Sequence, residues 1–325
     1  MTQNNKNYPI DAVITWVDGN APEHRKKRAK YAAGGELKDD AIGGAVRFES
    51  VGEIFFCVAS ILRFAPFIRK IYIVTDGQNP CLDGFVNKHF PDRTTEIEIV
   101  DHKSVFNGYE ALLPVFNSLS IESMLWRIPG LSERYVYFND DVMLAAPVTP
   151  EDFFSDGRIV CRAERFSMFY GKILKDLRLL KFGRKVFGFK DAMMNAVKAL
   201  GGGKEFIYFD HTPHPQMVSI FKEYYSEHED TLLKNACPRF REFHQYNPQE
   251  LNYLLADRKG KCLILPKKGA LLYLHPKGKP NYIRRKINYF NAHPEIKFCC
   301  LNSLSNAKPE DIVLAKEWLM NRIGI

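Results

Sequence analysis

The sequence predicts an α/β protein with a mostly parallel central sheet and a helical insertion. Two apolar runs rich in β-branched residues, 11–17 and 70–75, are typical of strands buried on both faces. A helical pattern over 54–65 lies between them. Strand, helix and strand at this spacing favour a right-handed crossover, which places the two strands parallel in one sheet.

Two helices are predicted in the first half of the chain. The first begins with a capping box formed by Ser50 and Glu53 and ends before Pro66. Its apolar residues follow the helical period at Ile54, Phe55, Val58, Ile61, Leu62 and Ala65. The second is predicted over 117–128, where Pro129 and Gly130 end it.

Further strands complete the predicted sheet. Residues 96–100 alternate in polarity and are expected near its edge, and 135–138 form a fourth strand. Later elements are predicted as strands at 206–209, 262–265 and 271–274 and as an amphipathic helix at 309–323.

Composition and charge limit the class of protein. With 46% hydrophobic and 26% charged residues, the 325-residue chain is an ordinary folded protein. No apolar run reaches the ~20 residues of a membrane-spanning helix, and the polar N-terminus predicts no signal peptide. The seven cysteines lack a CxxC pair, so we expect neither disulfides nor a zinc ribbon, but a reduced, cytoplasmic protein.

A net charge of +8 predicts an anionic partner. Nucleotide, phosphorylated glycan and membrane surface remain open, whereas no zinc finger or RNP motif supports nucleic acid. We divide the chain into an α/β half at 8–160, a basic helical insertion at 161–205 and a completing half at 206–325. Within 162–190, nine Lys and Arg residues face only two acids. This segment is either a solvated face or a contact with anionic lipid or glycan.

Polar clusters follow three of the four early strands. They are Trp16-Val-Asp18-Gly19, Thr75-Asp76-Gly77-Gln78 and Asn139-Asp140-Asp141. Turn chemistry alone accounts for any one of them. Because open α/β sheets bind ligands beyond the carboxyl ends of their strands, three such clusters favour a common site.

Asp140 and Asp141 are the strongest candidates for chemistry. Adjacent carboxylates repel each other, and hard oxygen ligands without His or Cys suit Mg²⁺ or Mn²⁺; a helix N-cap is the alternative. His211 is a candidate general base, although its position taken alone favours a structural histidine. Arg239 and Arg241 form a patch suited to binding phosphate.

Together these motifs resemble the Stealth family, which includes bacterial capsular-polysaccharide phosphotransferases and the catalytic subunit of animal lysosomal-enzyme GlcNAc-1-phosphotransferase. Four regions match it in order. They are Asp11-Ala-Val-Ile-Thr-Trp-Val-Asp-Gly19, the stretch from Arg47 to Asn139-Asp-Asp-Val142, His211-Thr-Pro-His214 with Arg241, and Lys297-Phe-Cys-Cys-Leu-Asn302.

The resemblance implies a sugar-nucleotide-binding fold, Rossmann-type or GT-A-like. It also implies a metal-assisted transfer of hexose-1-phosphate, or of its N-acetylhexosamine equivalent, from a UDP-sugar donor to a glycan acceptor, with release of UMP. Asp140, Asp141 and Asn302 would serve the metal, His211 the acceptor hydroxyl and Arg241 the transferred phosphate. Substrate and nucleotide contacts are expected from Trp16, Asp18, Gly19, Arg47, Glu53, Thr75, Asp76, Gln78, Asn117 and His214.

Two positions depart from the family pattern. Ala59 stands where the family often has arginine, and Ser303 where it has aspartate. Arg47 and Arg63 are candidates to replace the missing arginine. Ala59 and Ser303 keep open a non-catalytic glycan- or nucleotide-binding relative. The other alternative is a glycosyltransferase on the same fold that releases UDP. The basic insertion adds a predicted peripheral contact with the inner face of an anionic membrane.

Overall fold

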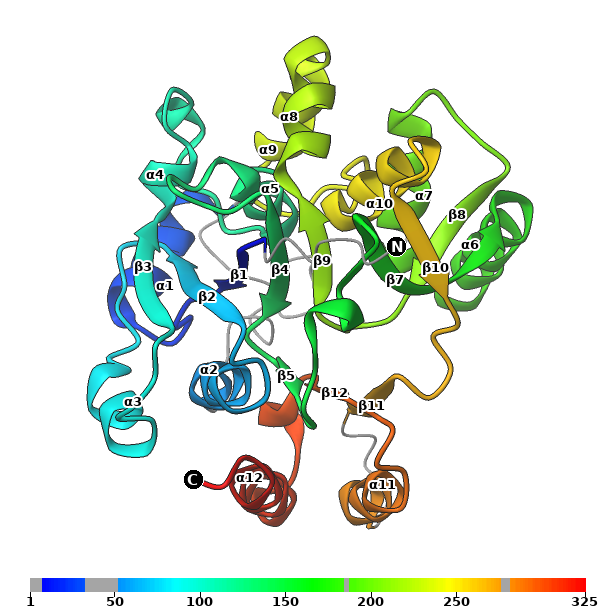
Figure 1. Ribbon diagram of the computed structural model, residues 1–325. Coiled ribbons are helices and arrows are strands. Elements are labelled where there is room, and N and C mark those ends of the chain that lie inside the picture. The colour runs from blue at the N-terminus through cyan, green and yellow to red at the C-terminus, as the bar shows by residue number, and fades with distance from the viewer. Residues whose placement is uncertain (1–7, 33–51, 184–186, 276–280) are drawn as a thin grey trace, which may run out of the picture.

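A five-stranded sheet forms the centre of the computed structural model, which describes residues 8–32, 52–183, 187–275 and 281–325. Its order is β3–β2–β1–β4–β9 (Figure 1). The first four strands are parallel and only β9 is antiparallel, which confirms the predicted mostly parallel sheet. The strands span Ile10–Thr15 (β1), Ile68–Thr75 (β2), Glu96–Asp101 (β3), Arg134–Asn139 (β4) and His214–Met217 (β9).

Burial explains the strand order. β1 lies between β2 and β4, and its Ala12, Val13 and Ile14 are completely buried, as their unbroken apolar run predicted. β3 lies at the edge, in agreement with its alternating pattern. The sheet changes direction between β1 and β4, because β2 and β3 extend from one side of β1 and β4 lies on the other. Such a switch point leaves a crevice beyond the carboxyl ends of the strands.

Helix α2 (Glu53–Phe64) confirms the first predicted helix but not its capping box. Its N-cap is Gly52, in the left-handed conformation with φ of 90°. Glu53 is therefore the first helical residue rather than the third, and Ser50 lies outside the described residues. The second predicted helix is shorter than expected, with α5 ending at Glu122 and a separate 3-10 turn at Leu125–Arg127.

Two smaller sheets extend the central one. The first contains β6 (Phe154–Ser155), β7 (Arg158–Ser167) and β10 (Cys262–Leu265), with β8 (Glu205–Phe209) paired to β7. The second contains β5 (Val142–Leu144), β11 (Leu271–Leu274) and β12 (Phe298–Leu301). Because β12 pairs with β5 directly after β4, the C-terminal chain returns to the site-bearing edge of the central sheet.

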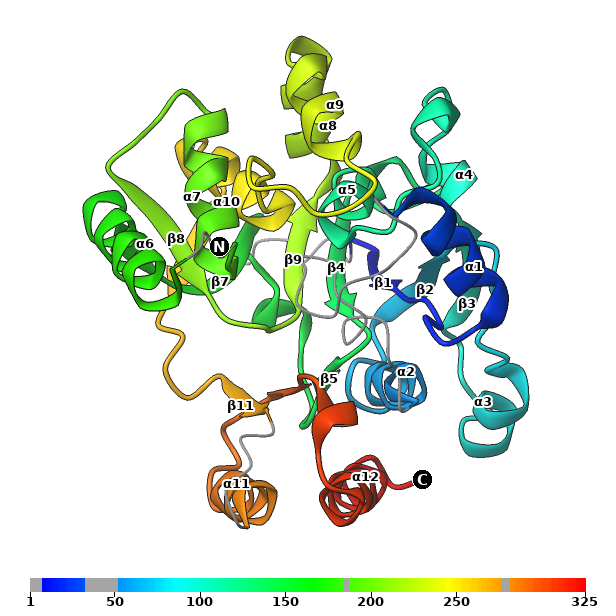
Figure 2. The ribbon, with the colours of Figure 1, turned by 180° about the vertical axis from the view of Figure 1, so that it is seen from behind.

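The helices surround these sheets. They include α1 (Pro22–Tyr31), α3 (Asp83–His89), α4 (His102–Val105), α5 (Ser118–Glu122), α8 (Val218–Glu227), α9 (Glu229–Ala236) and α10 (Pro248–Arg258). Helices α11 (Tyr282–Asn291) and α12 (Pro309–Ile323) lie side by side beneath β11 and β12 (Figures 1 and 2). None of the helices in the described ranges is long and apolar enough to cross a bilayer.

The predicted insertion, 161–205, contains α6 (Met168–Phe182) and α7 (Phe189–Ala199). Its first residues are not helical, since they complete β7 and pair with β8. Both views place α6 at the side of the molecule opposite β3 (Figures 1 and 2). The division of the chain into three parts stays a prediction.

Candidate active site

A cavity of about 510 Å³ opens at the carboxyl ends of β1, β2 and β4. Thr15 and Trp16 contribute from the end of β1, Asp76 from the loop after β2, and Asp140 from the loop after β4. The cavity therefore occupies the switch point of the sheet, where adjacent connections leave the sheet in opposite directions.

The cavity brings together many of the residues predicted from the sequence. Its walls include Trp16, Glu53, Asp76, Asn117, Asp140, Asp141, His211, His214, Arg241 and Asn302. Asp18, Gly19, Thr75 and Gln78 lie outside the lining, and Arg47 lies outside the described residues. Arg241, not Arg239, contributes to the wall.

Asp18 and Gln78 shape the loops instead. The Gln78 amide accepts a hydrogen bond from the Asp18 backbone N–H at 2.8 Å and donates to the Asp18 carbonyl at 3.1 Å. The Asp18 carboxylate accepts from the Asn20 backbone N–H. The two Gln78 bonds join the loop after β1 to the loop after β2, and the Asn20 bond stabilises the first of these loops.

Carboxylates dominate one end of the cavity. Asp140 and Asp141 keep some exposure to the cavity, yet the surrounding protein raises the pKa of both. After desolvation, the charges of Asp141 and Glu53 are the main reasons for the raised pKa of Asp140. In the described part of the chain, no lysine or arginine forms an ion pair with either aspartate. A bound cation would relieve this repulsion.

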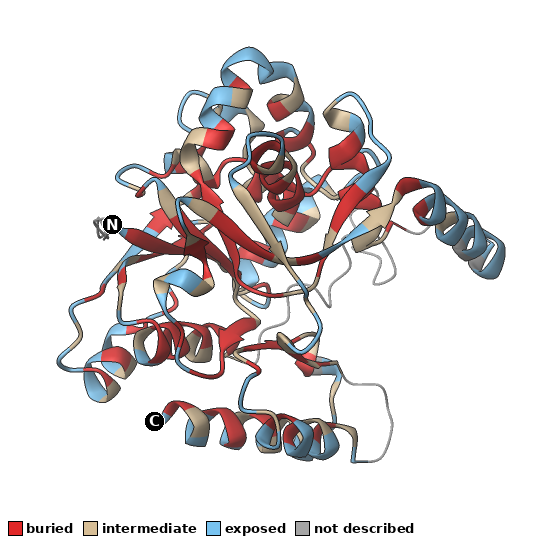
Figure 3. Ribbon diagram, turned by 45° about the vertical axis from the view of Figure 1, so that its right-hand side comes forward, coloured by how far each residue is buried: buried red, intermediate tan, exposed pale blue. Residues whose placement is uncertain are grey.

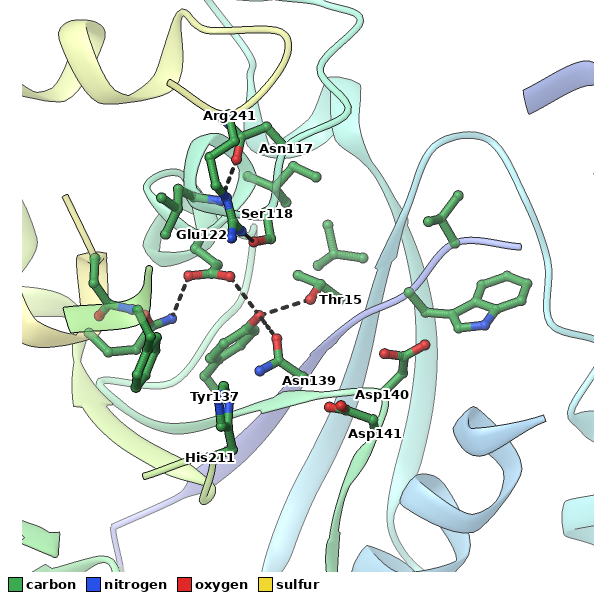
Figure 4. Close-up of a pocket in the computed structure, with 18 of the residues that line it drawn as sticks. Thr15, Asn117, Ser118, Glu122, Tyr137, Asn139, Asp140, Asp141, His211 and Arg241 are labelled. Carbon is green, nitrogen blue, oxygen red and sulfur yellow. Dashed lines mark hydrogen bonds between the residues drawn. The ribbon is translucent and has the colours of Figure 1, made fainter. Parts of the chain in front are cut away.

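Arg241 occupies a separate group of side chains (Figure 4). Its Nη2 donates to Ser118 Oγ at 2.6 Å, and it lies near the buried carboxyl of Glu122. Burial raises the pKa of Glu122, while the Gln249 amide, which donates to Oε2 at 3.1 Å, and the Arg241 charge oppose that effect. The motif analysis had assigned no role to Glu122.

The Tyr137 hydroxyl connects this group to β1 and β4. It lies 2.9 Å from Thr15 Oγ1, 3.2 Å from Glu122 Oε1 and 2.7 Å from Asn139 Oδ1 (Figure 4). A hydroxyl has one proton to donate. If Tyr137 donates to Asn139, the Thr15 hydroxyl and a protonated Glu122 supply the other two hydrogens. The raised pKa of Glu122 agrees with this arrangement.

His211 lies on the opposite side of the cavity from Arg241 in the close-up, near Asp141 (Figure 4). Its ring stacks between Phe189 and Tyr273, with centroid distances of 4.7 and 5.7 Å. Burial lowers the pKa of His211, whereas the negative charge of Asp141 raises it. A neutral imidazole held between two aromatic rings is suited to accepting a proton.

His214 has a different environment. It belongs to β9, where it pairs with Tyr137, and its Nδ1 lies 3.2 Å from the Tyr253 hydroxyl. Burial lowers its pKa to about 3, with a smaller effect from the charge of His211. Its ring lines the cavity but is fixed by packing within the sheet.

Two family-model matches lie in the first half of the chain. Stealth protein CR1, conserved region 1, matches residues 8–36, and Stealth protein CR2, conserved region 2, matches 47–161. The capsular polysaccharide phosphotransferase WcwK of Streptococcus pneumoniae is 30% identical over 94% of this chain and 93% of its own. The chain belongs to the Stealth family. The receptor polysaccharide phosphotransferase WefC of Streptococcus oralis aligns over the same shares, also at 30% identity.

Other similar proteins align with less of this chain or at lower sequence identity. An exopolysaccharide phosphotransferase of Streptomyces coelicolor is 42% identical over 45% of this chain, which spans only 23% of that protein. Two solved structures align at TM-scores of 0.46 and 0.43 and 11% and 10% identity. They are the galactosyltransferase LgtC with donor and acceptor sugar analogues, covering 96% of this chain and 95% of its own, and mouse xyloside xylosyltransferase 1, covering 90% and 96%. The fold assignment rests on the strand order of the Stealth chain itself.

The end of the cavity near β2 and β3 holds a further polar group around Asp76, whose neighbours His24, Lys27 and His102 had been assigned no role from the sequence. Asp76 forms an ion pair with Lys27 at 2.6 Å, its Oδ2 lies 3.6 Å from His24 Nδ1, and His102 lies near it. Burial lowers the pKa of His102 to about 4, so its ring is neutral at pH 7. Within the described ranges, Trp16 Nε1 and His102 Nδ1 are buried without a protein partner. Both are therefore available to a ligand.

Proposed function

We propose that this Stealth protein transfers a hexose-1-phosphate, or an N-acetylhexosamine-1-phosphate, from a UDP-sugar to a hydroxyl of a cell-surface glycan and releases UMP. One observation carries the proposal. A single cavity places an unneutralised carboxylate pair, a neutral histidine and a half-buried arginine around one open space. These groups match a diphosphate, an attacking hydroxyl and a transferring phosphoryl group.

The reaction joins the acceptor oxygen to the β-phosphorus of the donor. The bond between that phosphorus and the bridging oxygen breaks, and UMP leaves with the oxygen. His211 accepts the proton of the acceptor hydroxyl, and its lowered pKa keeps it unprotonated at neutral pH. Arg241 binds the phosphoryl oxygens, where negative charge develops, through its planar donors. The sugar C1–O bond is not broken, so the anomeric configuration is retained.

A divalent cation, Mg²⁺ or Mn²⁺, fits the carboxylate end. In the described ranges, no group of three or more His, Cys, Asp or Glu side chains is arranged to hold a metal alone. Asp140 and Asp141 would hold it together with donor phosphate oxygens, as is common for Mg²⁺. When bound, the ion neutralises charge on the diphosphate and on departing UMP. Asn302 is a weaker candidate ligand, because its Oδ1 accepts from Ser303 Oγ and lies 3.0 Å from His275 Nδ1.

The opposite end of the cavity suits the donor nucleotide. Trp16 Nε1 and His102 Nδ1 are possible donors to a bound base or ribose, and Asp76 is a possible acceptor. The glycan acceptor enters from the side of His211. Peripheral association with the inner face of an anionic membrane, suggested by the basic insertion, would bring the site close to membrane-assembled acceptors.

The test is the nucleotide released from a panel of UDP-sugars with a glycan acceptor, together with phosphorus NMR of the product. UMP and a phosphodiester signal in the glycan support the proposal. UDP with no phosphorus in the glycan indicates a glycosyltransferase, and binding without either nucleotide indicates a non-catalytic relative.

A further inference from the structure

Helix α6 exposes an apolar surface to solvent. Phe169, Ile173, Leu177 and Leu180, which we call the outer stripe, are 67%, 39%, 54% and 79% exposed. Spacings of four, four and three residues place them on one face of the helix. Figure 3 shows most of this helix as exposed at the side of the molecule. Tyr170 and Leu174, also exposed, widen the stripe.

The outer stripe is not the face by which α6 packs on the rest of the protein. The opposite face of α6 is already packed, because Gly171 is buried against Met194 and Phe206. A Cβ at Gly171 would lie 2.6 Å from Met194 Sδ, so this close approach requires glycine. The helix therefore has two apolar faces, one packed on the protein and one without a partner in the described chain. A surface helix normally places polar residues on the second face.

Positive charge borders the outer stripe. By sequence, α6 has four basic residues and one acid, Asp176. Lys172 and Lys175 lie close enough to Lys198 of α7 for their charges to help burial lower its pKa. Within the described residues, Lys175 lies 3.7 Å from an acid of α7, Asp191. The apolar stripe is thus combined with a cluster of like charges.

We propose that the outer stripe of α6 is a docking surface for an anionic lipid bilayer. Phe, Ile and Leu side chains would enter the acyl boundary while the lysines bind lipid phosphates, as in other interfacial helices. Pairing with a second copy is disfavoured, because it would bring together two helices that each carry four basic residues and one acid. Gly188 and Phe189, which follow α6 closely, line the cavity, so docking would hold the cavity near the membrane.

The test is flotation of the full chain with vesicles of phosphatidylcholine alone or with phosphatidylglycerol. We expect binding only to the anionic vesicles, at about 50 mM salt, with release at about 500 mM. Leu177→Ser combined with Leu180→Ser removes apolar contact without changing charge, and should lower the bound fraction by about tenfold. The matched control, Val313→Ser with Met320→Ser, changes two exposed apolar residues of α12 and should bind normally.

The remaining outcomes are equally informative. Equal loss in the α6 and α12 variants, or no binding by the unaltered protein, overturns the proposal. Light scattering that shows a lipid-free dimer, converted to monomer by the α6 variant, identifies the stripe as an interface between copies instead. The assay needs no turnover, so its result is independent of the proposed transfer reaction. The α6 variant should also release UMP at the unaltered rate with a short, water-soluble acceptor.

Discussion

Replacing Arg241 with lysine keeps the positive charge but removes the planar pair of N–H donors. In the structure its Nη2 is 2.6 Å from Ser118 Oγ, and its charge lies near Glu122. A lysine ammonium is a point charge and cannot hold Ser118 and a phosphoryl oxygen in the same geometry. The substitution therefore tests whether the planar pair of N–H donors, rather than the positive charge, stabilises the transition state.

The expected loss follows from one hydrogen bond to a charged group. Such a bond contributes about 1.5–3 kcal/mol, and the half-buried position of Arg241 favours the lower part of that range. The lysine variant should therefore lose about 10- to 50-fold in kcat/KM. Arg241→Ala also removes the charge beside Glu122 and should lose about 10²- to 10⁴-fold.

The assay is steady-state UMP release, with kcat and KM determined separately. Arg239→Lys is the matched control, because that guanidinium lies 4.8 Å from the ring centroid of Tyr31 and outside the cavity lining. It should stay within about twofold of the unaltered enzyme. A lysine variant at 241 with full kcat/KM, or equal damage at both positions, would refute the assignment of Arg241 to the phosphate.

Three further predictions follow from the same site. Asp140→Asn and Asp141→Asn should each lower kcat by a factor of about 10²–10⁴. Chelation of divalent cations should abolish activity, and added Mg²⁺ or Mn²⁺ should restore it. Full activity in EDTA would contradict both expectations. His211→Ala should lower kcat more than it raises KM. Because the pKa of His211 lies below 6.5, kcat of the unaltered enzyme should fall only when the pH drops below that value. A fall in kcat that begins above pH 7 would exclude this role. His214 has a pKa of about 3 in the folded protein against 6.5 in the unfolded chain, so its contribution to stability is complete above pH 6.5 and is lost as the pH falls toward 3. His214→Gln should therefore reduce the pH dependence of the free energy of unfolding in urea between pH 7 and 5, by up to about 1.4 kcal/mol per pH unit. An unchanged pH dependence in the variant would contradict this.

Local patterns predicted the four parallel strands of the central sheet because buried parallel strands require continuous apolar runs. The helix at 309–323 was also correct to its ends, since Pro309 begins it and Gly324 caps it. The strands β5, β9 and β12 were not predicted. Each has three or four residues, too few to show a period, and β12 is held by pairing with β5 more than a hundred residues earlier.

The site residues likewise divide into those that a local pattern identifies and those that depend on contacts with distant parts of the sequence. Asp140 and Asp141 were predictable because they follow a recognisable strand, and strand ends meet at one edge. Glu122 was missed because a glutamate in a predicted helix normally faces solvent. Its burial depends on Gln249 and Arg241, which lie more than a hundred residues away in the sequence. The available signal was the family resemblance, since Glu122 lies within the matching stretch from Arg47 to Val142.

The two departures from the family pattern have different structural consequences. Ala59 is completely buried in α2 and lies outside the cavity lining, so alanine there bears on packing around the helix rather than on a ligand. Arg63 does not replace the missing arginine, because its guanidinium donates to the carbonyls of Ile323 and Gly324. Ser303, in contrast, lines the cavity and donates to Asn302, whose amide in turn contacts Asp141. A carboxylate at 303 would add negative charge beside the proposed cation position. With serine at this position, the proposed cation site relies on Asp140 and Asp141 for its charged ligands, so Ser303→Asp is expected to change the affinity for the cation.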